Sequence, residues 1–162
     1  NQHFGTSDDL KSLVKTAHSK DIWIMVDVVG NHGGPIGQDY SKFGAPLNKR
    51  EHYHEYCNVL DIDHVENQWR VERCWLAGLA DFNHENPFVY ETLVNWIGNM
   101  TSYFDIDGLR IDTVCHVPHH FWGDFNKSSN VFQIGEALDK RAKYVASYQR
   151  FLEGEFFFYI WL

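Results

Sequence analysis

The amino-acid sequence predicts an α/β fold built around a parallel sheet. Strand-length apolar segments rich in β-branched residues alternate with segments of helical periodicity. The chain has 162 residues, 44% of them apolar, which is sufficient for one core. Its net charge of -8 argues against binding nucleic acid, and its longest apolar run, residues 156–162, is shorter than the roughly 18 residues of a membrane-spanning helix.

The first two predicted elements are a helix and a strand. A polar cluster at residues 6–9 precedes apolar residues spaced i, i+3, i+4 and i+7, which predicts a helix over residues 7–19. Residues 22–29 are almost continuously apolar, as is typical of a strand buried on both faces. Asp27 is the one charged residue in that strand, and its charge requires an explanation.

The segment at residues 33–87 has a different character. It is rich in Gly, His, Asn, Asp and Tyr, and it has no sustained period. A structureless loop of that length is improbable in a compact domain, so the sequence predicts a small inserted subdomain. We therefore expect the sheet and its helices to come from residues 1–32 and 88–162.

Regular elements return after the insertion. Apolar residues between positions 89 and 104 fall on one helical face. The further predicted elements are strands over residues 108–112, 131–135 and 156–162, and helices over residues 118–127 and 140–152. This order fits either an open doubly wound sheet or about half of an eight-stranded barrel, which takes about 250 residues when complete.

Polar residues follow the strands, at the carboxyl ends where parallel α/β folds place their reactive groups. The candidates are Asp27, Asn31 and His32 at the end of the first strand, Arg110, Asp112 and His116 at the end of the second, and Glu136 at the end of the third.

Two of these carboxylates suggest a catalytic pair. Arg110 and Asp112 are two residues apart on a strand, so both side chains project to one side and the guanidinium favours an ionised Asp112. Glu136 follows an apolar stretch that would raise its pKa and keep it protonated. Such a pair can act as nucleophile and general acid in glycoside cleavage. The structural alternative is an Arg110–Asp112 ion pair and a Glu136 that caps the next helix.

Three segments resemble signature regions of the α-amylase family of glycoside hydrolases, in the same order and with similar spacing. They are VDVVGNH at residues 26–32, GLRIDTVCHV at 108–117 and IGEALD at 134–139. GTSDDLKSLV at 5–14 and VERCWLAGLADFN at 71–83 are similar to the secreted fungal-type enzymes. The resemblance implies a partial (β/α)8 TIM barrel with a small subdomain inserted after the third barrel strand. It also implies retaining hydrolysis of internal α-1,4-glucosidic bonds in starch, glycogen and related α-glucans.

The resemblance also implies roles for single residues. Asp112 would be the nucleophile and Glu136 the general acid/base. The implied substrate-binding residues are Asp27, His32, Arg110 and His116. A structural Ca²⁺ would be held by Asn31, Glu72, Asn83 and the backbone carbonyl of His116, although Asn83 stands where an aspartate is expected. Alternatively, Asn31 only orders the turn after Gly30.

The cysteines and two sequons give information about the cellular compartment of the protein. The resemblance implies a disulfide between Cys57 and Cys74, which would fit a secreted, extracellular protein. Asn99 and Asn126 lie in sequons that could accept N-glycans. Cys115 stands where fungal members usually carry a sugar-binding lysine, and a free thiol is the alternative to a redox or metal role. A zinc site among His52, His54 and Cys57 lacks any zinc-binding motif.

Alternative functions remain open within this family. An α-glucosidase or transglycosylase would share the same segments, and a non-catalytic homologue could bind glucan without cleaving it. The family's third carboxylate lies in an Asn-His-Asp segment, and none follows Glu136. We therefore expect a fragment that is inactive alone, from a protein that acts on an α-glucan as a monomer. The sequence leaves the substrate's chain length, endo or exo preference and pH optimum open.

Overall fold

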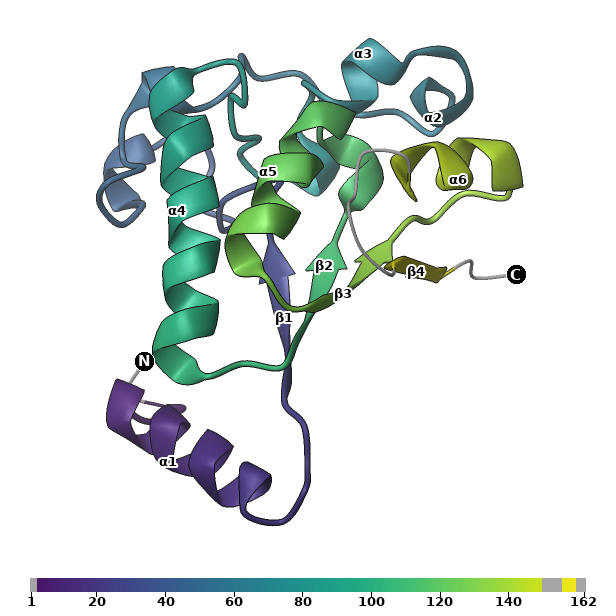
Figure 1. Cartoon of the computed structure of the whole chain (residues 1–162). Coiled ribbons are helices and arrows are strands. Elements are labelled where there is room, and N and C mark those ends of the chain that lie inside the picture. The colour runs from purple at the N-terminus through teal and green to yellow at the C-terminus, as the bar shows by residue number, and fades with distance from the viewer. Residues whose placement is uncertain (1–2, 150–155, 160–162) are drawn as a thin grey trace.

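The computed structural model describes residues 3–149 and 156–159, and its centre is a parallel sheet of four strands (Figure 1). The strands are β1 (Met25–Val29), β2 (Gly108–Asp112), β3 (Phe132–Glu136) and β4 (Phe156–Tyr159), hydrogen-bonded in that order. The parallel α/β fold predicted from the sequence is confirmed. The register pairs Asp27 with Arg110 and Val29 with Asp112, so the first two strands end level with each other.

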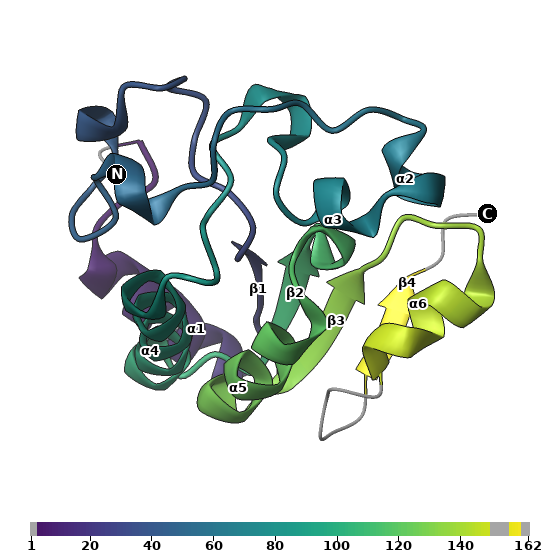
Figure 2. The same cartoon turned by 90° about the horizontal axis from the view of Figure 1, so that it is seen from above.

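Four longer helices accompany the sheet: α1 (Ser7–His18), α4 (Pro87–Phe104), α5 (His119–Ser129) and α6 (Ala142–Gln149). Seen from above, α4, α5 and α6 follow one another along the same side of the sheet (Figure 2). The predicted elements are confirmed with small shifts at their ends. The last residues of the predicted helix, 150–152, and of the predicted strand, 160–162, lie outside the described part of the chain. No helix in the described part is long and apolar enough to cross a membrane.

The helices α4 and α5 form the core with the sheet. Leu93 and Ile97 of α4, Phe121 of α5, and Leu109 and Ile111 of β2 are all buried in one cluster. At Gly98 a Cβ atom would lie 2.5 Å from the Ser128 hydroxyl and 2.8 Å from its carbonyl oxygen. This close approach lets α4 pack directly against α5.

The prediction of a first strand buried on both faces is wrong. β1 begins at Met25, three residues later than expected, and Ile22, Trp23 and Met25 are 52%, 84% and 44% exposed. Within the described residues β1 is an edge strand, so its apolar residues are covered on one side only. The apolar pattern indicates which residues a strand can bury, but it does not indicate which neighbouring elements cover them.

The segment between β1 and α4 lies at the end of the sheet toward which the strands point (Figure 1). It contains the short helices α2 (Asp63–Glu66) and α3 (Gln68–Val71), three 3-10 turns at Tyr40–Lys42, Arg50–His52 and Leu76–Gly78, and isolated bridges. The predicted disulfide between Cys57 and Cys74 is present. The division of the chain at residues 32 and 87 stays a prediction.

Candidate active site

Arg110 joins three carboxylates at the carboxyl ends of three neighbouring strands. Its Nη1 atom lies 2.6 Å from Asp112 Oδ1 and 3.0 Å from Asp27 Oδ1, and its Nη2 atom lies 2.9 Å from Glu136 Oε1. The strand period explains this grouping, because Leu109 and Ile111 are buried in the core while Arg110 and Asp112 point the other way. The structure therefore brings together four of the residues predicted from the sequence.

The cluster carries an excess of negative charge. Three ionised carboxylates and one guanidinium sum to -2. Partial burial lowers the pKa of Arg110, but its hydrogen bonds to Asp112 and Asp27 outweigh burial and raise the pKa above the usual value. Arg110 is therefore always charged, and it offsets the repulsion among carboxylates that would otherwise separate.

Glu136 has polar partners besides the apolar residues Leu76 and Leu138, which line the same cavity. Its side chain is 28% exposed, pairs with Arg110, and accepts a hydrogen bond from the backbone N–H of Thr113 at 3.2 Å. Both contacts fix the direction of the carboxylate. The prediction used the neighbours of Glu136 in sequence, whereas β2, its neighbour in the sheet, determines its partners. Thr113 reaches Glu136 from a left-handed backbone conformation, with φ of 51°.

His32 and His116 lie at the rim of the same region. Burial lowers the pKa of His32, and the negative charge of Asp112 opposes that shift. The ring of His116 is buried, and its Nδ1 atom lies 3.2 Å from the Val71 carbonyl oxygen in the insertion. A cavity of about 260 Å³ has Thr113, His116 and Glu136 among its lining residues.

Three oxygen atoms converge next to His116, one of the residues that line this cavity. The Asn31 amide is fully buried, with its nitrogen 3.1 Å from His32 Nδ1. Its other end faces Asp81 Oδ1 and the His116 carbonyl oxygen, each 3.0 Å away. When the Asn31 oxygen is at that end, it faces two other acceptors, Asp81 Oδ1 and the His116 carbonyl oxygen. Only a cation between them, or an amide turned by 180°, relieves the repulsion. Amide, carboxylate and carbonyl oxygens are the ligands that a hard cation such as Ca²⁺ takes, so the residues fit the implied metal.

Sequence reasoning missed Asp81 and named Asn83 and Glu72. The Asn83 side chain accepts a hydrogen bond from the backbone N–H of Glu85 at 3.1 Å, and Glu72 accepts one from Gln68 at 2.8 Å. Asp81 is two residues before Asn83 and supplies the aspartate that the resemblance leads one to expect. Its signal was an acidic residue directly after the apolar pair Leu79 and Ala80. No cluster of three His, Cys, Asp or Glu side chains suited to a metal exists in the described part of the chain.

Asp81 also contacts His54. The His54 Nδ1 atom lies 2.6 Å from Asp81 Oδ2, and its Nε2 atom lies 2.7 Å from Glu85 Oε2. Burial lowers the pKa of His54, but the hydrogen bonds to Asp81 and Glu85 outweigh it and raise the pKa to about 9. Because His54 has these partners and Cys57 is in a disulfide, the zinc alternative for this segment is excluded.

Three other predicted features have clear positions. Cys115 is a buried free cysteine, and burial raises its pKa to about 12, so it stays a thiol. Asn99 is exposed on α4, where a glycan could be accommodated. Asn126 is buried in α5, so the prediction of a glycan there conflicts with the packing of that helix.

Comparison with known proteins gives a consistent result. The description "Alpha amylase, catalytic domain" matches residues 1–157. A beta/alpha-amylase of Paenibacillus polymyxa is 44% identical over 93% of this chain and 13% of its own length. An alpha-amylase of Saccharomycopsis fibuligera is 36% identical over 95% of the chain and 32% of its own length. The chain thus spans a third or less of these relatives.

Solved structures agree with the sequence matches. An alpha-amylase from Malbranchea cinnamomea superposes with a TM-score of 0.85 and 38% identity, covering 94% of this chain and 33% of that one. An alpha-amylase from Geobacillus thermoleovorans, solved in complex with acarbose, gives a TM-score of 0.83 and 34% identity, covering 95% and 34%. The four parallel strands and their helices therefore correspond to part of a (β/α)8 barrel.

Proposed function

The chain belongs to the alpha-amylase family, and we propose that it contributes the catalytic nucleophile and the general acid/base of a retaining α-glucan hydrolase. The observation that carries the proposal is the meeting of Asp27, Asp112 and Glu136 around Arg110 at the ends of three parallel strands. The proposed substrates are starch, glycogen and related α-1,4-glucans, cleaved at internal bonds.

Asp112 is the proposed nucleophile. Its Oδ1 atom accepts a hydrogen bond from Arg110 Nη1 at 2.6 Å, and in a retaining reaction a carboxylate oxygen attacks the anomeric carbon. The guanidinium also fixes the direction of the carboxylate. Asp27 binds the same Nη1 atom of Arg110 and completes the negative surface that favours a positively charged sugar transition state.

Glu136 is the proposed general acid/base. In a retaining reaction this residue first gives a proton to the departing sugar oxygen and then takes one from water. In the free chain the Glu136 carboxylate contacts the Arg110 guanidinium and the backbone N–H of Thr113. His32 and His116 would contact the sugar at the rim.

A structural Ca²⁺ is the proposed metal, held by Asn31, Asp81 and the carbonyl oxygen of His116. When bound, it supplies positive charge that fixes the insertion to the ends of β1 and β2. His116 follows Asp112 by four residues, so the same backbone segment links the metal ligands to the nucleophile. The Cys57–Cys74 disulfide and the exposed side chain of Asn99 support secretion into an oxidising compartment.

The test is hydrolysis of a blocked maltooligosaccharide that can only be cleaved internally. Both the 162-residue chain and the longest natural protein that contains it are assayed, because we expect the chain alone to be inactive. In the longer protein, Asp112→Asn and Glu136→Gln should each remove cleavage, whereas Glu91→Gln, an exposed glutamate on α4, should leave it intact.

Other outcomes decide between the alternatives. Release of single sugars from chain ends, or transfer of sugar to an acceptor, would indicate an α-glucosidase or a transglycosylase. Binding of glucan without cleavage would indicate a non-catalytic homologue. Full activity in the Asp112→Asn and Glu136→Gln variants would refute the residue roles given above.

A further inference from the structure

Asp81 is a buried carboxylate whose two oxygens face different partners. The side chain is 0% exposed. Its Oδ1 atom lies 3.0 Å from the Asn31 amide, whereas its Oδ2 atom lies 2.6 Å from His54 Nδ1. Oδ1 therefore faces Asn31, and Oδ2 is bound by His54.

His54 cannot turn away from Asp81 without losing a second ion pair. Its Nε2 atom lies 2.7 Å from Glu85 Oε2, so both ring nitrogens face carboxylate oxygens and both carry hydrogen. Arg73 pairs with the other oxygen of Glu85. The imidazole is thus fixed between two carboxylates, and a guanidinium secures the outer one.

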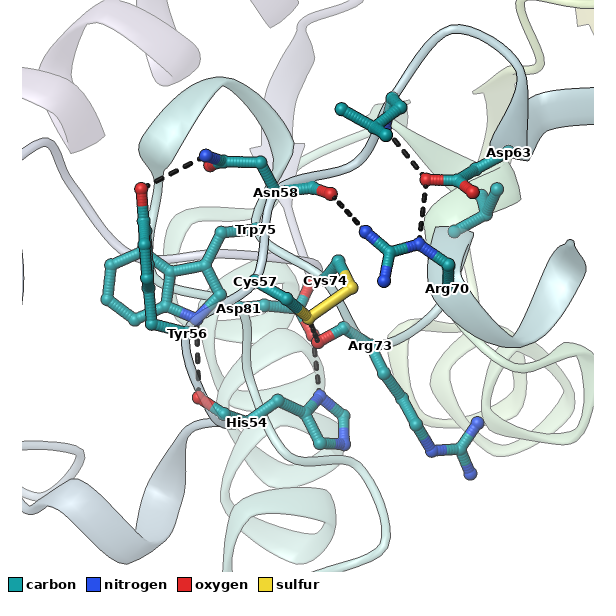
Figure 3. Close-up of a disulfide and its surroundings, with 12 residues drawn as sticks. His54, Tyr56, Cys57, Asn58, Asp63, Arg70, Arg73, Cys74, Trp75 and Asp81 are labelled. Carbon is teal, nitrogen blue, oxygen red and sulfur yellow. Dashed lines mark hydrogen bonds and ion pairs between the residues drawn. A yellow bond between two sulfur atoms is a disulfide. The ribbon is translucent and has the colours of Figure 1, made fainter.

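The backbone of His54 is fixed as well (Figure 3). Its N–H donates to the Asp81 carbonyl oxygen at 2.9 Å, and its own carbonyl accepts a hydrogen bond from Trp75 Nε1 at 3.2 Å. Trp75 follows Cys74 of the disulfide, and its backbone N–H donates to the Cys57 carbonyl oxygen. The disulfide-closed loop therefore holds His54 in position.

We propose that His54 is a positioning residue for the cation site: it holds Asp81 by Oδ2 so that Oδ1 stays directed at Asn31 and the His116 carbonyl. This inference rests on the cation site of the proposed function. Residues that orient a metal ligand without touching the metal commonly change metal affinity about 10- to 100-fold when removed. The disulfide loop, through His54, thereby sets the affinity of a site formed by residues at the strand ends.

The experiment measures Ca²⁺ binding by calorimetry in the full chain after treatment with a chelator. His54→Gln places a donor near Glu85 and away from Asp81, and we expect the Kd for Ca²⁺ to rise about 10- to 100-fold. His54→Asn keeps a donor near the position of Nδ1 and should stay closer to the native Kd. His52→Asn changes a buried histidine two residues away, stacked on Phe88, and should not change the Kd.

Melting temperatures with chelator and with Ca²⁺ separate positioning from general support of the fold. Positioning predicts that His54→Gln reduces the rise in Tm that Ca²⁺ produces. Equal losses of Tm with and without Ca²⁺ would overturn the inference, as would a native Kd in His54→Gln while Asp81→Asn loses binding, and both results leave the cation site standing. Absence of Ca²⁺ binding in the native chain would overturn both the cation site and the role of His54.

Discussion

Two groups of ion pairs lie a short distance apart and differ in their exposure to water. In the Arg110 cluster the side chains of Asp27, Arg110, Asp112 and Glu136 are 64%, 33%, 23% and 28% exposed. In the His54 pair, Asp81 is fully buried and His54 is 12% exposed. Water screens the charges of the first group and leaves them accessible to a ligand. In the second group, the buried charge is stabilised by its ion-pair partners rather than by water. Ion pairs of carboxylates with basic side chains are therefore open to solvent in one place and buried in the other.

Replacing His54 by leucine should produce the largest loss of stability. It leaves the Asp81 carboxylate buried without its partner, and breaking a buried pair in this way typically costs about 3–5 kcal/mol. Urea unfolding in the presence of chelator measures the change. A loss below about 1 kcal/mol would mean that water reaches Asp81, and the contrast between the two groups would disappear.

Removing the disulfide should produce the next largest effect. Cys57 and Cys74 are separated by 17 residues, and closing a loop of that size stabilises the folded state by about 3 kcal/mol. The Cys57→Ser, Cys74→Ser double variant should lose that amount in urea unfolding. If the loop holds His54 in position, adding this pair of substitutions to His54→Leu should cost less than the sum of the two separate losses.

Replacing Arg110 by methionine should change stability much less. Partly exposed pairs contribute about 0–1 kcal/mol, and the loss here would come mainly from repulsion among the three carboxylates. High salt screens that repulsion, so the difference from the native chain should shrink between low and high ionic strength. A loss of stability that does not change with salt would indicate that the cluster has a structural role similar to that of the buried pair.

The smallest effect should depend on pH and comes from the other end of the sheet. The hydrogen bond from His18 to Asp107, 2.8 Å long, raises the pKa of His18, and the backbone N–H of Ile24 lowers the pKa of Asp107. The contribution of His18 is therefore fully present below its unfolded pKa of about 6.5 and is lost as pH rises through its folded pKa. The Tm difference between native chain and His18→Gln should be larger at pH 5.5 than at pH 8.5.

The sequence carried enough information to predict the Arg110 cluster. Alternation places Arg110 and Asp112 on one side of a strand, and parallel strands end at a common edge, so Asp27 and Glu136 join them. Both rules start from the local periodicity of each strand, which the sequence shows directly.

The buried pair could not be predicted in the same way. His54 and Asp81 come from loop segments 27 residues apart that lack any period, and only the folded insertion brings them together. The same limit applies to the surroundings of Glu136 and Asn126. In each case, neighbours distant in sequence determine the surroundings of the side chain, as Arg110 does for Glu136.

Thr113 places a limit on how far this chain can be stabilised without altering its chemistry. A β-branched residue at φ of 51° is strained by about 1–3 kcal/mol, and its buried hydroxyl is among the few polar side-chain atoms of the described residues that lack a hydrogen-bond partner. Glycine at this position would relieve the strain and give more conformational freedom to the backbone whose N–H binds Glu136. Selection of variants for heat resistance alone would therefore favour Thr113→Gly and loosen the proposed proton donor.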